Sequence, residues 1–143
     1  MKLQLLAIAL LSTTLFATPL KAENPTHVKR LLETGACEGC NLSGANLRGA
    51  HLLGADLRNA NLQGATLINA NLEGADLTSA NLKGADLTGA FVSGTSLNNS
   101  NLTNVNFSKA KLHNADVTGA VMADITLTDA DVFNTGISIG GEY

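Results

Sequence analysis

The chain has 143 residues and a formal net charge of −3, with 45% hydrophobic residues, 3% aromatic residues and no tryptophan. This length allows one domain, and so few aromatic residues exclude a core built around aromatic rings. Lysine and arginine together number 9 against 12 acidic residues, and no basic run occurs. The charge balance therefore excludes a basic nucleic-acid-binding protein, and we expect no nucleic acid among the partners.

Residues 1–22 are typical of a secretory signal peptide. Met1 and Lys2 open a short positive region, an uncharged and mostly aliphatic run follows, and the segment ends in small residues. The apolar run contains Pro19 and is shorter than the roughly 20 apolar residues that a membrane span needs. We predict cleavage after Ala22, which leaves 7 basic and 12 acidic residues, a net charge of −5. The mature protein is expected to be exported, with no membrane anchor.

Residues 23–39 are predicted to form a short helix and a loop that contains cysteine. Asn24 followed by Pro25 is a helix start, because an N-cap side chain precedes a residue whose fixed φ suits the first turn. Gly35 is the expected end of the helix. Apolar residues recur between these signals at the spacing of one helical face: Val28, Leu31 and Leu32.

A five-residue repeat runs from Cys40 to Ile139 without an insertion. The third residue of each quintet is apolar in all 20 cases, the first is alanine in 14 cases, and the fifth is glycine or asparagine in 15 cases. In an α-helix a step of five residues rotates by about 140°, so the apolar residues would spiral around every side. In a straight strand the same step reverses the face each time. The period is satisfied only by a backbone that bends once per quintet, which predicts a solenoid with every third residue facing inward.

The repeat resembles the A-[DN]-L-x-x unit of pentapeptide-repeat proteins, as in residues 55–59 and 75–79, and the resemblance covers 100 of the 143 residues. It implies an all-β solenoid: a right-handed quadrilateral β-helix of about five coils over residues 40–139, with a short N-terminal capping α-helix and a tail at 140–143. Residues 31–42 also resemble the entrance of exported cyanobacterial members, which reside in the periplasm or the thylakoid lumen. Independent support for four quintets per coil comes from asparagines that recur at a spacing of twenty: Asn41, Asn61, Asn81 and Asn101.

Both ends of such a rod would expose strand edges and the apolar column, which invites end-to-end association of copies unless something covers them. Residues 24–34 are the expected lid at the first end. The candidates for the second end are Ile137, Ile139 and Tyr143.

Cys37 and Cys40 form a C-x-x-C pair, a pattern shared by redox centres, zinc half-sites and local disulfides. A zinc site would need His27 and a carboxylate to complete four ligands, since no second cysteine pair exists. A thioredoxin-like centre needs a βαβ setting, whereas this pair follows a helix. In an exported protein we favour a disulfide that pins the lid to the first coil, with Cys40 in an inward position. We expect no metal and no cofactor.

One side of the predicted rod collects outward-facing apolar residues. This side, the third of the four, is a candidate protein-interaction face. The alternative is that these apolar residues are exposed without serving any function. His51 and His113 lie about three coils apart on the third side, roughly 15 Å, which is too far to share a metal; both are expected to be solvated. The residues proposed for this face are His51, Leu53, Phe91, Lys111, His113 and Phe133.

No arrangement of catalytic residues can be argued, because serine and aspartate recur as repeat positions. The sequence therefore favours a non-enzymatic exported scaffold with a protein partner. One alternative, which the family resemblance implies, is a DNA-mimicking protein that protects topoisomerases such as gyrase; the small charge and the export signal speak against it. A second alternative is a thiol/disulfide redox protein that uses Cys37 and Cys40.

Overall fold

The computed structural model describes residues 23–137, and these contain three regular elements: helix α1 (Pro25–Thr34) and two short strands, β1 (Lys111–His113) and β2 (Asp131–Phe133). The strands pair in parallel, with Lys111 opposite Asp131. The predicted signal peptide and two of the residues proposed for the second lid, Ile139 and Tyr143, lie outside the described residues. Within residues 23–137 no helix is long and apolar enough to cross a lipid bilayer.

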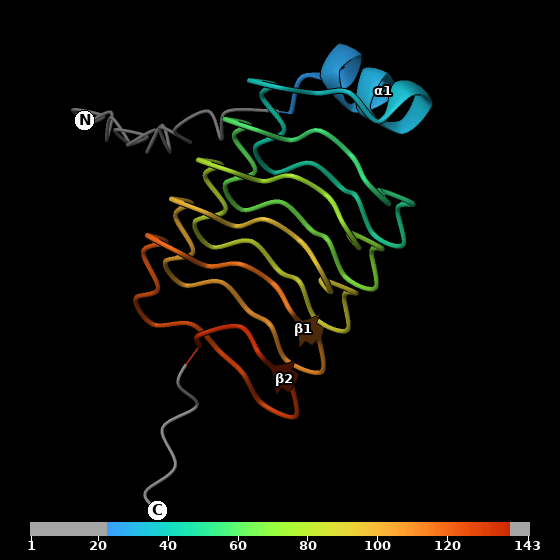
Figure 1. Cartoon of the computed structure of the whole chain (residues 1–143). Helices are drawn as coiled ribbons and strands as arrows, with labels where there is room; N and C mark the ends of the chain where they lie inside the picture. The colour runs from blue at the N-terminus through green and yellow to red at the C-terminus, as the bar shows by residue number, and fades with distance from the viewer. Residues whose placement is uncertain (1–22, 138–143) are drawn as a thin grey trace, which may run out of the picture.

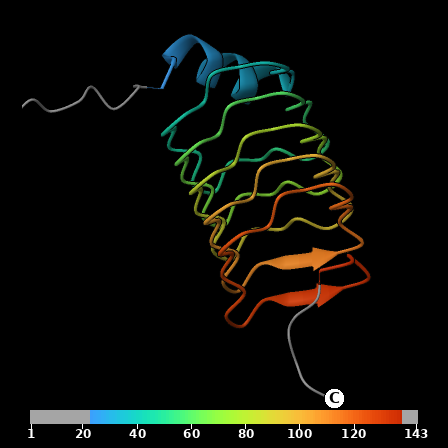
Figure 2. The ribbon, with the colours of Figure 1, turned by 90° about the vertical axis from the view of Figure 1, so that its left-hand side faces the viewer.

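The rest of the described chain forms a rod of stacked coils, with α1 at one end and β1 and β2 near the other (Figures 1 and 2). Parallel bridges join residues twenty positions apart, as in the column Asn41, Asn61, Asn81 and Asn101. Three further columns have the same spacing, so each coil contains four quintets. The predicted coil length is confirmed.

The structure contains fewer regular strands than we expected for an all-β solenoid. In the described part of the chain only β1 and β2 reach three residues, and the other sides pair through isolated bridges at the second residue of each quintet. The reason is the corner in every quintet, which interrupts the extended backbone before a longer ladder can form. The molecule is a β-solenoid built mainly from single bridges.

The fifth residue of each quintet forms the corner. Its φ is positive at every such position from Gly44 to Asn134. Most of these residues are glycine or asparagine, and the others are Ser79, Lys109 (φ 58°), Asp124 and Asp129. Asparagine tolerates this left-handed conformation better than most residues with a Cβ, which explains its frequency there. The second residue supports the turn: the Thr78 N–H donates to Asp76 Oδ1 at 2.9 Å. The recurrent acidic residues at this position therefore hydrogen-bond the backbone of the turn.

The third residues fill the interior, and side chains such as Leu72, Leu87 and Phe107 are fully buried. Stacking begins before the first predicted quintet, because Ala36 already bridges Asp56 and the Cys37 N–H donates to the Asp56 carbonyl at 2.7 Å. Cys37 thus occupies a central position in the same column as the leucines. The cysteine loop belongs to the wall of the first coil.

The two ends of the rod differ. Helix α1 covers the first end through Leu31, which is fully buried, and Val28, which packs against the core. At the other end the central residues of the last coil are only partly buried: Met122, Leu127, Val132 and Ile137.

Candidate functional site

The third side of the rod is the column of bridges His51, Asn71, Phe91, Lys111 and Asp131, together with the outward fourth residues of the same quintets. All six residues proposed for the interaction face lie on this side. Leu53 is 69% exposed, Phe133 66% and Phe91 38%. The described residues include only two other exposed large apolar side chains, Leu32 and Val121, which lie elsewhere. Exposed apolar surface is therefore concentrated on the third side.

The aromatic rings of this side each contact a polar neighbour one coil away. The Lys111 ammonium lies 5.5 Å from the centre of the Phe91 ring, a cation–π distance. The ring of His113 meets Phe133 edge to face, with centroids 6.1 Å apart. His113 Nε2 also lies 2.8 Å from Asp131 Oδ2, an ion pair whenever the imidazole is protonated. The His113 side chain, expected to be solvated, is 39% exposed and also belongs to a cluster with Phe133 and Asp131.

A hollow of about 300 Å³ opens on the same side. Its lining comes from three successive coils: Gly49, His51, Asn69, Asn71, Glu73 and Phe91. Of these, only His51 and Phe91 were predicted from the sequence to belong to the interaction face. The spacing of twenty between Asn71 and Phe91 was a usable signal, but a depression lined by residues of three neighbouring coils exists only once the coils are stacked.

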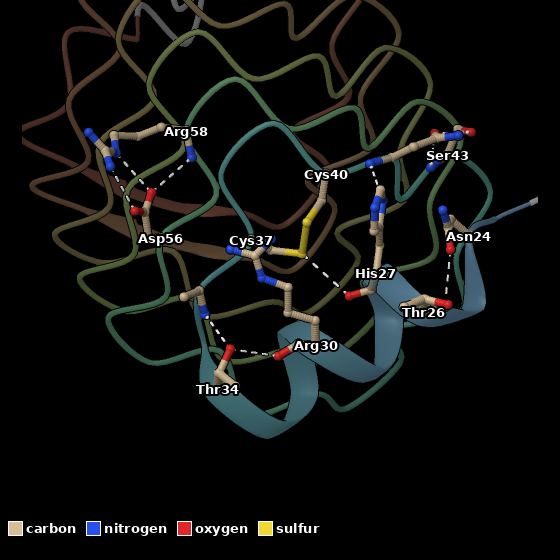
Figure 3. Close-up of a disulfide and its surroundings, with 12 residues drawn as sticks. Asn24, Thr26, His27, Arg30, Thr34, Cys37, Cys40, Ser43, Asp56 and Arg58 are labelled. Carbon is tan, nitrogen blue, oxygen red and sulfur yellow. Dashed lines mark hydrogen bonds and ion pairs between the residues drawn. A yellow bond between two sulfur atoms is a disulfide. The ribbon is translucent and has the colours of Figure 1, made fainter.

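The cysteine pair lies where α1 joins the first coil (Figure 3). Cys37 and Cys40 are joined by a disulfide, and both residues are buried. The Cys37 Sγ also lies 3.3 Å from the His27 carbonyl oxygen. The bridge therefore sits between the helix and the wall of the rod. In the described part of the chain no group of three or more His, Cys, Asp or Glu residues is arranged to hold a metal ion.

Side chains of the N-terminal segment accept hydrogen bonds from the edge of the first coil. Within the rod, the N–H of each second residue donates to a carbonyl of the preceding coil, as Asn61 does to Cys40 at 2.8 Å. The first coil has no preceding coil, and side chains take its place. Its edge N–H groups have these acceptors: Thr34 Oγ1 for Ala36, His27 Nδ1 for Asn41 and Glu23 Oε2 for Asn46. His27, weighed as a zinc ligand, is a capping residue.

Two carboxylates have pKa values below their usual range. For Asp56 the main cause is the hydrogen bond from the Arg58 side chain, which also pairs with Glu38 at 3.1 Å. For Asp116 it is the hydrogen bond from the Thr118 hydroxyl, helped by the Thr118 N–H. Neither group is buried or faces a cavity, so both are structural.

The structure is that of a repeat protein: a solenoid with its interior filled by side chains. Any binding surface therefore lies on the outer sides of the rod. A family profile described as pentapeptide repeats matches in eight copies, over residues 37–73, 55–94 and 92–124. The chain belongs to the pentapeptide repeat family.

The chain is also similar to solved structures of other pentapeptide repeat proteins. The pentapeptide repeat protein alr5209 of Nostoc PCC 7120 is 31% identical, with 73% of this chain and 95% of that chain covered and a TM-score of 0.62. A pentapeptide repeat protein of the Arabidopsis thaliana thylakoid lumen is also 31% identical, over 67% of this chain, with a TM-score of 0.43. The matched region spans 61% of the length of that plant protein.

A more distant likeness shows the fold alone. A trypsin-treated variant of QnrB1, a plasmid-mediated fluoroquinolone resistance protein, is 21% identical over 70% of this chain and 53% of that one, with a TM-score of 0.53. A search of curated proteins finds no match to this chain.

Proposed function

We propose that this protein is a non-enzymatic scaffold of the periplasm or thylakoid lumen: a right-handed quadrilateral β-helix, capped by α1, that binds a protein partner along its third side. The signal-like residues 1–22 support export. Pentapeptide repeat proteins generally serve as structural or interaction proteins, which supports a non-catalytic role.

The observation that carries the proposal is the gathering of Leu53, Phe91 and Phe133 on one side of a rod whose interior is already filled. Burying an exposed side chain of this size releases about 1.5–3 kcal/mol. The free energy released when a partner covers all three side chains offsets part of the entropic cost of association. The remaining residues proposed for the face, His51, Lys111 and His113, would supply polar contacts around the apolar ones.

The test replaces Leu53, Phe91 and Phe133 with serine and compares the proteins captured by proximity labelling in the exported compartment. We expect the variant to melt like the wild type and to lose the labelled partner. A matched control changes Leu32 and Val121 to serine, which removes exposed apolar surface from other parts of the molecule. Equal labelling by the wild type and both variants would rule out the third side as the interface.

Protection of a topoisomerase by DNA mimicry is the second candidate function, and the fold likeness to QnrB1 is what favours it. The charge speaks against it, because duplex DNA carries one charge per about 1.7 Å of its axis, whereas the chain after residue 22 carries a net charge of −5 over the whole rod. A gyrase supercoiling assay with added mature protein separates the two functions. Protection from a fluoroquinolone would favour mimicry.

A redox function for Cys37 and Cys40 is the third candidate. A thiol exchange partner must reach one of the two sulfur atoms, and both residues are almost completely buried, Cys37 at 0% and Cys40 at 2% exposure. The burial supports a structural disulfide. A reduction potential below about −300 mV, the range of structural disulfides, would agree with that role.

We also propose that two copies associate end to end through the last coil. Met122, Leu127 and Val132 are only partly buried there, while α1 covers the other end. Sedimentation at increasing protein concentration tests this contact. Leu127→Lys should leave the chain monomeric if the contact forms in solution.

A further inference from the structure

One residue that lines the hollow on the third side, Glu73, is acidic and has no cationic partner among the described residues. Glu73 is partly buried and lines the hollow, and its backbone N–H donates to Asn71 Oδ1 at 2.9 Å. Among residues 23–137 no lysine, arginine or histidine lies within ion-pair distance of its carboxylate, whereas Asp56 and Asp131 both have such a neighbour. An ionised carboxylate gains from a charge-assisted hydrogen bond to a cation supplied by another molecule.

Phe91 also lines the hollow, and its aromatic ring already has one cationic side chain beside it. The Lys111 ammonium lies 5.5 Å from the ring centre. Cations are drawn to the negative face of an aromatic ring. Glu73 and Phe91 line the same hollow, so a single cationic group bound in it would lie between the two residues.

The hollow also has room for such a group. Gly49 lines it without a side chain, and a Cβ built there would meet no atom within 4 Å. The amide side chains of Asn69 and Asn71 supply polar groups around the space. A volume of about 300 Å³ accommodates the end of one long side chain.

We propose that this hollow binds the guanidinium group of an arginine on the protein partner. A guanidinium is planar, stacks on aromatic rings, is weakly hydrated and donates two parallel hydrogen bonds to a carboxylate, which matches a ring beside a partly buried Glu73. Lysine offers a compact and strongly hydrated ammonium and fits this lining less well. The proposal rests on the proposed function, because it assigns one anchor to the interface on the third side.

The experiment titrates ¹⁵N-labelled mature protein with acetyl-arginine amide and follows the backbone amide signals by NMR. Acetyl-citrulline amide is the matched probe, since it has nearly the same shape and no charge. We expect saturable shifts at Glu73, His51 and Phe91 with arginine, and binding of citrulline that is weaker by about tenfold or more. Absence of saturable shifts up to about 50 mM arginine, or equal binding of the two probes, overturns the proposal.

Three variants locate the binding. Glu73→Gln should weaken arginine binding by about tenfold, because it removes the charge and keeps the shape. Glu33→Gln removes the same charge from the exposed face of α1 and should bind like the wild type. Lys111→Met should tighten binding by about two- to threefold, since it removes a competing cation beside Phe91. Unchanged binding in Glu73→Gln also overturns the proposal.

The failure of this proposal can be told apart from the failure of the proposed function. If arginine fails to bind while the triple serine variant still loses its partner, the third side is an interface and the arginine assignment alone is wrong. If arginine binds in the hollow while the triple variant keeps every partner, the interface assignment is wrong; the hollow then binds a guanidinium group but does not anchor a partner on the third side.

Discussion

His27 Nδ1 accepts a 2.9 Å hydrogen bond from the backbone N–H of Asn41, at the point where a preceding coil would supply a carbonyl oxygen. The helix therefore does more than cover the apolar column. It supplies an acceptor to the exposed edge of the solenoid, which would otherwise carry an unpaired N–H. Thr34 and Glu23 act in the same way at two other sides of the first coil.

Replacing His27 with alanine should lower the free energy of unfolding by about 1–3 kcal/mol, because the Asn41 N–H loses its acceptor at a partly buried site. Urea denaturation of the mature protein measures this change. His51→Ala is the control, since it removes an exposed imidazole from the third side and should leave the free energy of unfolding within about 0.5 kcal/mol of the wild type. Equal midpoints for His27→Ala and His51→Ala would contradict the capping role.

Changing Cys37 and Cys40 to serine together should destabilise the fold and leave partner binding intact. Opening such a short disulfide loop costs about 2 kcal/mol, and the double variant also buries a hydroxyl at the central position of Cys37. Thermal melting of the oxidised protein and the variants measures the loss.

The matched control is Cys37→Val with Cys40→Ala, which restores the residue types of an ordinary quintet. This variant should lose less stability than the serine pair, and the difference reports the buried hydroxyls. A disulfide-reductase turnover that disappears in the serine variant would instead favour the redox reading.

Leu72→Asp should abolish cooperative unfolding, because it places a charge in the filled interior of the rod, where Leu72 has no exposure. The cost of such a burial exceeds about 4 kcal/mol and rivals the stability of a small domain. Circular dichroism during heating is the measurement. Asn71→Asp introduces the same charge at the neighbouring outward position and should melt cooperatively. A wild-type melt for Leu72→Asp would refute the inward assignment of the third residues.

Asp116 should contribute to stability at neutral pH and lose that contribution in acid. The Thr118 hydroxyl and N–H favour the ionised carboxylate, so the pKa of Asp116 is lower in the folded state than in the unfolded chain. A group with a lowered folded pKa stabilises the fold above its unfolded value, near 4, and this stabilisation disappears as the pH falls through the folded value.

We therefore expect Asp116→Asn to reduce the stability difference between pH 6 and pH 2, measured by urea titration at each pH. Asp129→Asn removes the same charge at a corner, and its stability difference should follow the wild type. A steeper acid loss in Asp116→Asn would contradict the assigned direction.

The coil was predictable from the sequence because its determinants are local. A corner needs a residue that accepts positive φ, and such residues recur at every fifth position from Gly44 onward. The inward leucines follow from that period, and the spacing of Asn41 and Asn61 correctly indicated four quintets per coil. The helix bounds were equally readable, since Asn24 caps the N-terminus and Gly35, with φ 68°, ends it.

The capping role of His27, the central position of Cys37 and the hollow beside Glu73 were decided by the tertiary structure. Each depends on groups that stacking brings together from different coils, or from a coil and α1. A five-residue period fixes which side chains point inward, because that is a property of one turn of backbone. It leaves open which polar atoms meet across the end and along the sides of the rod, since these contacts depend on the register between coils and on the docking of the helix.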